Sequence, residues 1–404
     1  MIPFLSSALK LCSMAILYFA RRLAHDRKGR IVVKGISKRS ISLCGAVAAY
    51  ACGCGAPITA RAQPTIIKGL SYSQEATYGI ETLQQWYSQS SGFYSAPSGW
   101  WNSANAITVL VNYSRITNST QYASVIANTF KKANSAHGTT NFINNYVDDE
   151  GWWALAWIDA YDLTGNEAYL TMAQTIFADM ASEWNTTTCG GGVWWNKSRG
   201  GTYKNAIANE LFLSVAASLA NRVSDPTPRV QYLTWAQTEW QWFKNSGMIN
   251  SQNLVNDGLT STNPNACTNN GARTWSYNQG VILGGLVELY KADQDPTLLP
   301  QAQAIAAAAI ARLTASSGIL IEPVSGGDLP QFKGIFVRNV MALYQAAPKV
   351  QYKTFVDANA NSIWTNDQGP NYEFGAVWQG PFDSADATRQ TSALDALIAA
   401  IQIQ

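Results

Sequence analysis

The sequence predicts an all-α fold in which twelve helices form six hairpins and the hairpins close into a ring. Apolar residues recur at helical spacing in about a dozen segments. No segment alternates convincingly between apolar and polar residues, as a strand would. A weak echo of one helical hairpin plus a loop returns at intervals of about 50 to 65 residues. With 404 residues, 47% of them hydrophobic, the chain can bury a core of this size in one domain.

The predicted helices follow one another from residue 75 to the end of the chain. They cover Glu75 to Ser91, Trp100 to Ile116, Gln121 to Asn134, Glu150 to Leu163, Glu167 to Trp184, Lys204 to Val223, Arg229 to Asn245, Tyr277 to Ala292, Leu298 to Thr314, Leu329 to Ala346, Gln351 to Thr365 and Ser384 to Ile403. A polar turn followed by Tyr or Leu and an Ala-rich helix recurs at Tyr122, Tyr169, Tyr232 and Tyr352, with a poorer copy at Leu298. We expect one helix of each pair to lie inside the ring.

Helices without this echo begin with unusual polar and aromatic residues. These stretches are Trp100 to Asn105, Asp148 to Trp153, Thr202 to Glu210, Trp275 to Gly280 and Asp328 to Arg338. If these helices form the inner ring, their N-terminal ends open on one face and gather Asp, Asn, Lys, Tyr and Trp in a single cleft, as in sugar sites. The glycine-rich loops Cys189 to Trp195 and Asn256 to Gly258 would form its rim.

Residues 1–62 have the features of a leader with a secretory signal. Lys38 and Arg39 precede an apolar, small-residue run, and Ala60-Arg61-Ala62 fits the cleavage pattern. An earlier apolar run, Pro3 to Ala20, could be a signal anchor, or the long lead could come from a mispredicted start. We expect residues 63–404 to form a single secreted domain that does not span a membrane.

Charge is distributed unevenly between the leader and the rest of the chain. Ten of the 28 Lys and Arg residues but one of the 26 acids precede residue 63, so the remainder carries a net charge of −7. A body with this charge does not attract nucleic acid or anionic lipid. We therefore expect no nucleic-acid partner, and we expect the mature chain to be a monomer.

The cysteines and sequons agree with export. Four of the six cysteines lie in the leader, and the remaining pair, Cys189 and Cys267, is expected to form a disulfide between two loops, with two free thiols as the alternative. N-glycosylation sequons begin at Asn112, Asn118, Asn185 and Asn196.

One stretch, Tyr146 to Trp153, combines three successive acids with two tryptophans. Cleaving a bond between two sugars needs one protonated carboxyl, one ionised carboxyl and flat rings on which a pyranose can lie. Asp149 could instead be the N-cap of the following helix, and Glu150 is more typical of a first-turn helix acid than of a third catalytic group.

Other catalytic chemistries lack the residues that they need. His137 is the only histidine after the leader, so neither a Ser-His-Asp site nor a His-rich metal site can be assembled readily. No phosphate-binding loop, dinucleotide fingerprint or paired-cysteine zinc spacing is present. We therefore expect no metal and no cofactor, and carboxylates remain as the reactive groups.

Four motifs together resemble fungal members of glycoside hydrolase family 76, the endo-α-1,6-mannanases. They are Asp148 to Trp153, Tyr203 to Leu211, Trp275 to Gly280 and Phe332 to Arg338, and the resemblance covers about residues 70–402. It implies an (α/α)6 barrel that cleaves the α-1,6-linked mannan backbone, or manno-oligosaccharides, with retention. Asp148 would be the nucleophile and Asp149 the general acid/base, an assignment that spacing cannot make.

The same resemblance places Asp257 and Tyr277 at the −1 sugar subsite. We expect further substrate contacts from Asn278, Trp152, Trp153, Asn205, Trp101 and Lys333. Trp100, Trp101, Trp194 and Trp195 could equally be core residues, and we interpret Lys204 and Arg338 as structural partners of buried acids.

Two other functions remain open from the sequence. The first is a transglycosidase of wall mannan, although an amphipathic C-terminal segment predicts no lipid anchor. The second is a catalytically dead mannan-binding protein, which the intact Asp pair argues against.

Overall fold

The computed structural model describes residues 23–25, 31–33, 69–134, 139–199, 203–260 and 266–404. The chain divides into two compact units, Met1–Ala62 and Gln63–Gln404. In the first unit, the described residues form two antiparallel strands, β1 (Leu23–His25) and β2 (Ile31–Val33). The predicted signal segment after Lys38 lies outside the described residues, so the leader stays a prediction.

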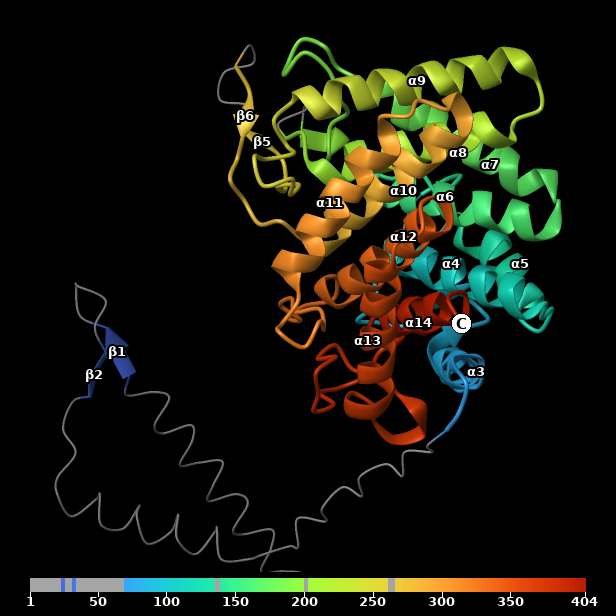
Figure 1. The fold of residues 1–404 in the computed structure, drawn as a ribbon, viewed down its shortest axis with the longest axis vertical. Helices are drawn as coiled ribbons and strands as arrows, with labels where there is room; N and C mark the ends of the chain where they lie inside the picture. The colour runs from blue at the N-terminus through green and yellow to red at the C-terminus, as the bar shows by residue number, and fades with distance from the viewer. Residues whose placement is uncertain (1–22, 26–30, 34–68, 135–138, 200–202, 261–265) are drawn as a thin grey trace, which may run out of the picture. The chain divides into compact units, whose positions relative to one another are not determined.

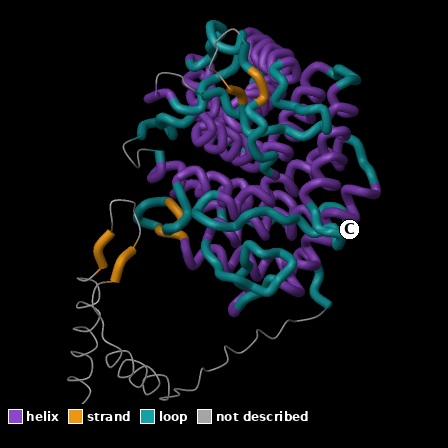
Figure 2. Tube along the Cα trace, turned by 90° about the vertical axis from the view of Figure 1, so that its left-hand side faces the viewer, coloured by secondary structure: helices purple, strands orange, loops and turns teal. Residues whose placement is uncertain are grey.

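The described part of the second unit contains twelve α-helices (Figures 1 and 2). They are α3 (Tyr72–Leu83), α4 (Trp100–Thr117), α5 (Ala123–Ala133), α6 (Val147–Thr164), α7 (Glu167–Ser182), α8 (Ala206–Arg222), α9 (Pro226–Asn245), α10 (Ser276–Asp293), α11 (Leu298–Leu313), α12 (Phe332–Ala346), α13 (Val350–Asn366) and α14 (Ala387–Ile401). Each predicted helix corresponds to one of them, which confirms the all-α prediction. None of the helices described is both long and apolar enough to cross a bilayer.

Six of these helices form an inner ring. Helices α4, α6, α8, α10, α12 and α14 contact one another in that order, and α14 also contacts α4. The burial pattern agrees, because every residue of α8 from Ala206 to Ala220 is buried, whereas α9 buries only four residues. The predicted inner helices are therefore the inner helices of an (α/α)6 barrel.

The outer layer contains α5, α7, α9, α11 and α13, each of which follows an inner helix in the chain. The sixth outer helix is α3, which packs against α14, so the first and last helices of the barrel complete the ring (Figure 1). This closure ties residue 72 to residue 401 in one domain.

The structure corrects the end of the first predicted helix. Helix α3 stops at Leu83 rather than Ser91, and a 3-10 turn (Gln84–Trp86) leads into a small hairpin of β3 (Tyr87–Ser88) and β4 (Phe93–Tyr94). Gly92, in the turn between β3 and β4, has a φ of 76°, which glycine adopts without strain. A second short pair, β5 (Leu259–Thr260) and β6 (Thr268–Asn269), lies in a loop.

Three more 3-10 turns lie in connections, at Lys197–Arg199, Leu329–Gln331 and Pro370–Tyr372. The turn at Leu329–Gln331 stands where the sequence predicts the first turn of an α-helix, so α12 begins at Phe332 instead of Leu329. Pro330 explains this difference, because proline removes a backbone donor while it favours the tight turn before α12.

Candidate active site

The N-terminal ends of five inner helices and the loops before them surround a cleft of about 470 Å³. Its walls are formed by Trp101, Tyr146, Asp148, Asp149, Trp152, Trp195, Tyr203, Asn205, Asp257, Tyr277, Asp328 and Phe332. These residues come from α4, α6, α8, α10 and α12 or from the segments just before them. Acidic and aromatic side chains predominate, and the described residues that line the cleft include no lysine or arginine.

The two adjacent aspartates lie in the first turn of α6. This helix begins at Val147, with Tyr146 as an N-cap that makes no side-chain capping bond. The alternative that Asp149 caps the helix is therefore wrong. Negative charge at a helix N-terminus is stabilised by the unpaired N–H groups of the first turn, so this position favours an ionised carboxylate.

Asp148 accepts a hydrogen bond from the indole of Trp195. The distance from Nε1 to Oδ2 is 3.0 Å. Burial raises the pKa of Asp148 well above its usual range, and the neighbouring Asp149 adds to this effect. The Trp195 bond and the backbone N–H groups of residues 148 and 149 act in the opposite direction.

Asp149 accepts a hydrogen bond from the side-chain amide of Asn144. The distance from Nδ2 to Oδ2 is 2.7 Å. Burial raises the pKa of Asp149 to about 7, the Asn144 bond lowers it, and the charge of Asp328 raises it. The donors to the two carboxyls therefore differ, since an indole donates to Asp148 and a side-chain amide donates to Asp149.

Two adjacent buried carboxyls titrate together, because the charge on one raises the pKa of the other. Asp148 receives donors from Trp195 and from two backbone N–H groups, whereas Asp149 receives one amide donor. Because donors stabilise the ionised form, the hydrogen bonds favour the charge on Asp148 more than on Asp149, in opposition to burial.

A second acidic centre lies in the cleft at Asp257. The Tyr203 hydroxyl donates to Asp257 Oδ2 at 2.5 Å, and Asn270 Nδ2 donates to the Tyr203 oxygen at 3.0 Å. The neighbouring Gly258 packs tightly here, because a Cβ on it would lie 2.6 Å from the Tyr203 hydroxyl oxygen. The loop is thereby held against the start of α8.

Tyr277 comes from the first turn of α10 and lines the same cleft. Its ring stacks on Phe332, with centroids 3.8 Å apart and planes at 8°. Burial raises the pKa of Tyr277, and the charges of Asp257 and Asp148 raise it further. The structure therefore brings together Tyr277, Asp257 and the Asp pair, which belong to separate helical hairpins.

Each of three tryptophan pairs has one member in the cleft and one outside it. Trp101, Trp152 and Trp195 line the cleft, while Trp100, Trp153 and Trp194 do not. Trp153 is completely buried and packs on Trp100 with centroids 5.6 Å apart. Successive residues are about 100° apart on a helix and on opposite sides of an extended segment, so neighbouring side chains point in different directions. In each of these pairs one ring lines the cleft and the other does not.

Three predicted sugar contacts are corrected by this placement. Trp153 belongs to the core, and Asn278 has no exposed surface. Lys333 is 1% exposed and donates to the Ala376 carbonyl oxygen at 2.5 Å, with its ammonium 4.2 Å from the Trp378 ring centroid. Asn205 does line the cleft, although its Oδ1 is used to cap α8 by accepting from Ala208 N at 3.2 Å.

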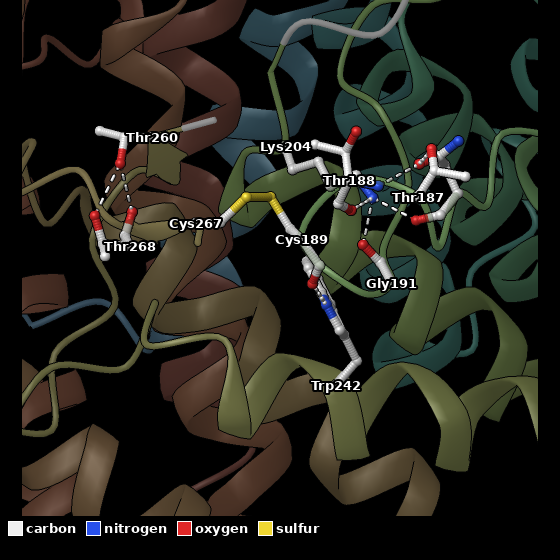
Figure 3. The surroundings of a disulfide bond; sticks show 10 residues. Thr187, Thr188, Cys189, Gly191, Lys204, Trp242, Thr260, Cys267 and Thr268 are labelled. Atoms are coloured by element: carbon white, nitrogen blue, oxygen red, sulfur yellow. Dashed lines mark hydrogen bonds between the residues drawn. A yellow bond between two sulfur atoms is a disulfide. The ribbon is translucent and has the colours of Figure 1, made fainter. Parts of the chain in front are cut away.

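The predicted disulfide is present on the rim (Figure 3). Cys189 and Cys267 are joined with an S–S distance of 2.01 Å, and the Trp242 indole donates to the Cys189 carbonyl oxygen at 2.8 Å. Two loops that are 78 residues apart in the chain are therefore tied together.

Lys204 supports the same rim loop. Its ammonium donates to the carbonyl oxygens of Asn185 at 2.6 Å and Thr188 at 2.7 Å, and also to that of Gly191 (Figure 3). The ammonium also lies 4.6 Å from the Trp194 ring centroid. These contacts confirm a structural role for Lys204, although the bonded partners are backbone carbonyls and not the predicted buried acid.

Arg338 is also structural. It donates to Asp395 at 3.2 Å and to Asn105 at 2.5 Å. It lines a second cavity, of about 210 Å³, between the inner helices. Arg222, which lines the same cavity, bonds Glu288 at 2.8 Å.

The four sequons differ in accessibility. Asn118 is exposed at the end of α4, and Asn185 is half-buried on the rim. Asn196 is 6% exposed and accepts from Ser198, and Asn112 lies within α4 with its oxygen bonded to Arg115 at 2.7 Å. Burial therefore argues against a glycan at Asn196, while glycans at Asn112, Asn118 and Asn185 stay predictions.

Several cleft residues were not predicted as site residues from the sequence. They are Tyr146, Tyr203, Asp328 and Phe332, and Trp195 was left undecided between core and cleft. Their position in the sequence could have identified them, because all five lie at or just before the N-terminus of an inner helix or in the rim loop. Position relative to the helix start predicts cleft residues better than residue type does.

Paired buried carboxyls in an aromatic cleft at one end of an (α/α)6 barrel are typical of helical-barrel glycosidases. The chain belongs to glycosyl hydrolase family 76, whose sequence model matches residues 63–404. It is 29% identical over 220 residues to the mannan endo-1,6-alpha-mannosidase DCW1 of Candida albicans, a match that covers 49% of this chain and 46% of that protein. The chain thus spans about half the length of the first curated relatives. DCW1 of Saccharomyces cerevisiae is 25% identical to this chain over 350 residues, and the match covers 77% of this chain and 74% of that protein.

Solved structures show the same fold. The GH76A alpha-1,6-mannanase of Salegentibacter sp. HEL1_6 has a TM-score of 0.76 and 21% identity, and the alignment covers 83% of this chain and all of that one. An inactive variant of it, in complex with alpha-1,6-mannotriose, has a TM-score of 0.75 at 22% identity, with the same coverage. Dfg5 of Chaetomium thermophilum, in complex with glucosamine, has a TM-score of 0.74 at 20% identity, covering 84% and 92% of the two chains.

Proposed function

We propose that this protein is a secreted, retaining, endo-acting glycosidase that cleaves α-1,6-mannosidic bonds in a mannan backbone. The observation that carries the proposal is the Asp148–Asp149 pair, which lies in an aromatic cleft with different hydrogen-bond donors on its two carboxyls. One ionised and one protonated carboxyl are what double displacement at a sugar requires. The names of the family relatives point to α-1,6-mannan as the substrate.

In the first step, the Asp148 carboxylate attacks C1 of the mannose in the −1 subsite. The bond from C1 to the leaving O6 breaks, and Asp149 gives its proton to O6. A covalent mannosyl-enzyme results, with Asp149 now ionised.

In the second step, Asp149 takes a proton from a water molecule whose oxygen attacks C1. The bond between C1 and Asp148 breaks, which restores both carboxyls and retains the anomeric configuration. The pKa of Asp149, raised to about 7 by burial, suits a group that donates and then accepts a proton.

The −1 mannose would be held by Asp257 and Tyr277. The Asp257 carboxylate, oriented by Tyr203, can accept from two vicinal sugar hydroxyls, and the Tyr277 hydroxyl lies toward the same acids. Trp101 and Trp152, which stack at 5.6 Å, provide an apolar surface for a neighbouring sugar.

The test is to incubate the secreted protein with linear α-1,6-mannan and to size the products while recording their anomeric form. Internal cleavage to α-configured oligosaccharides is expected. Release of mannose alone would overturn endo action, and β-configured products would overturn retention. Adding a mannobiose acceptor distinguishes transfer from hydrolysis, because transfer produces chains longer than those present at the start.

A further inference from the structure

Asn144 lies two residues before the N-cap of α6, and three of its polar groups are bonded to the start of that helix. Its Nδ2 donates to Asp149 Oδ2 at 2.7 Å, and its Oδ1 accepts from the Tyr146 N–H at 2.7 Å. Its backbone N–H donates to Glu150 Oε1 at 2.9 Å. Because Oδ1 must face the Tyr146 N–H, the amide has one allowed orientation, with Nδ2 toward Asp149.

A buried ion pair anchors this arrangement. Glu150 has no exposed surface, and the Oε1 atom that accepts from Asn144 also accepts from Lys197 Nζ at 2.5 Å. Lys197 in turn forms an ion pair with Asp179 of α7. Its backbone N–H donates to the Asn145 carbonyl oxygen at 2.9 Å. Asn144 is thus fixed to α6, α7 and the rim loop at once.

We propose that Asn144 is a positioning residue that determines which oxygen of Asp149 carries the catalytic proton. This inference rests on the proposed function. An amide N–H can only donate, so Oδ2 must act as the acceptor and the proton of the neutral acid resides on Oδ1. The protonated oxygen is then the one that Asn144 leaves free to face the glycosidic oxygen.

The same bond serves both steps of the reaction. When Asp149 is neutral, Asn144 holds Oδ2 and leaves the Oδ1 proton for the leaving O6. When Asp149 is ionised, Asn144 still holds Oδ2, and Oδ1 accepts the proton of the attacking water. One oxygen therefore gives and takes the proton without a rotation of the carboxyl group.

The charged groups around Asp149 set the direction of a pH effect. Asp148 lies beside it in the same turn, Asp328 faces it from the segment before α12, and Glu150, paired with Lys197, lies behind Asn144. The acids favour the protonated form of Asp149, and the Asn144 amide favours the ionised form. Loss of the amide therefore raises the proton affinity of Asp149 while it removes its orientation.

The test compares Asn144→Ala with Asn145→Ala, the same change at an exposed neighbour. Each variant is assayed on a linear α-1,6-manno-oligosaccharide and on α-mannobiosyl fluoride, whose leaving group departs without a proton. For Asn144→Ala we expect kcat/KM on the oligosaccharide to fall about 30-fold or more, within the range of general-acid catalysis, and to stay within about threefold on the fluoride. The alkaline limb of the oligosaccharide pH profile should move to higher pH. Asn145→Ala should match the parent.

Equal losses on both substrates would overturn the proposal, because they indicate a structural role. Unchanged activity on the oligosaccharide, or an alkaline limb that stays in place, would overturn it as well. Should Asn144→Ala fail to fold, Asn144→Asp keeps the acceptor for Tyr146 and loses the donor when ionised, and the same split is expected. A parent inactive on both substrates would overturn the proposed function together with this inference, whereas an active parent with an unaffected variant counts against Asn144 alone.

Discussion

The indole N–H of Trp195 donates to Oδ2 of Asp148 at 3.0 Å, although the two residues are 47 positions apart in the chain. Backbone bonds hold Trp195 on both sides. Its N–H donates to the Tyr203 carbonyl oxygen at 2.9 Å, and its own carbonyl oxygen accepts from Val147 N–H at 3.1 Å. The rim loop is therefore bonded to the starts of α6 and α8, and the orientation of Asp148 depends on this tertiary contact.

Trp195→Phe tests the contribution of that bond. The ring remains and the donor is lost, so the pKa of Asp148 should rise, because the bond lowers it in the parent. Asp148 is then less ionised at a given low pH, and the acidic limb of kcat/KM should move to higher pH. We expect a loss of about tenfold on that limb, equivalent to one charged hydrogen bond. A limb in the parental position would show that Trp195 does not stabilise the Asp148 carboxylate.

Asp148→Asn and Asp149→Asn test the catalytic pair. Each should lower kcat/KM on α-1,6-mannan by at least about 10³, because nucleophile and general acid contribute separately to the barrier. The folds should persist, since asparagine fills the same volume, and circular dichroism checks this. Activity within tenfold of the parent would remove that residue from catalysis.

Azide rescue then assigns the two roles. With a small side chain at position 148, azide would attack C1 directly and give the inverted β-mannosyl azide. With a small side chain at position 149, azide would attack the mannosyl-enzyme and give the retained α product. The opposite pair of products would exchange the roles of Asp148 and Asp149.

The Cys189–Cys267 bond should contribute more to stability than to activity. The cross-link joins positions 78 residues apart, and for a loop of this length its loss should destabilise the fold by about 2 to 5 kcal/mol. Trp242 and Lys204 hold the Cys189 loop independently, so the cleft should largely persist. A Cys189→Ala/Cys267→Ala double variant, followed by thermal denaturation and by mannan cleavage, measures both effects. An unchanged denaturation midpoint, or two alkylatable thiols in the unreduced parent, would contradict this expectation.

The helices could be predicted from the sequence because their signals are local. The helix predicted from Leu298 to Thr314 is α11, Leu298–Leu313, since its apolar spacing lies within one segment. The start of α6 was missed by three residues because Tyr146 provides no capping side chain that would mark it. Without a capping residue to mark the helix start, the acidic sequence of the first turn is also typical of a polar loop.

The detailed site could not be predicted, because it depends on contacts between distant segments. Periodicity implies that Trp152 and Trp153 point in different directions, but which of them faces the cleft depends on how α6 is rotated against α4 and α8. The partners of Asp148 and Asp149 come from a rim loop and from a segment before the helix, and neither Trp195 nor Asn144 is marked by a spacing rule. Lys333 was predicted to bind sugar because it stands in a motif, yet its ammonium is buried against Ala376 and Trp378.

Tyr277→Phe tests whether the −1 subsite is correctly located. The variant keeps the stack on Phe332 and removes one hydroxyl, which lies toward Asp257 and Asp148 in the parent. Hydrogen bonds to the −1 sugar can strengthen as its ring flattens toward the transition state. We therefore expect kcat/KM to fall by a factor of about 5 to 150, which corresponds to a loss of about 1 to 3 kcal/mol of transition-state stabilisation.

The loss should lie mainly in kcat, because an interaction that forms only in the transition state does not alter ground-state binding. Tyr290→Phe, on the same helix but away from the cleft, is the matched control and should leave both kinetic constants as in the parent. A change in KM alone would show that Tyr277 contacts the substrate equally in the ground state and the transition state. Unchanged kinetics would show that Tyr277 has only a packing role in α10. Thermal denaturation should separate these outcomes from a loss of folding, since the Phe332 stack persists in the variant.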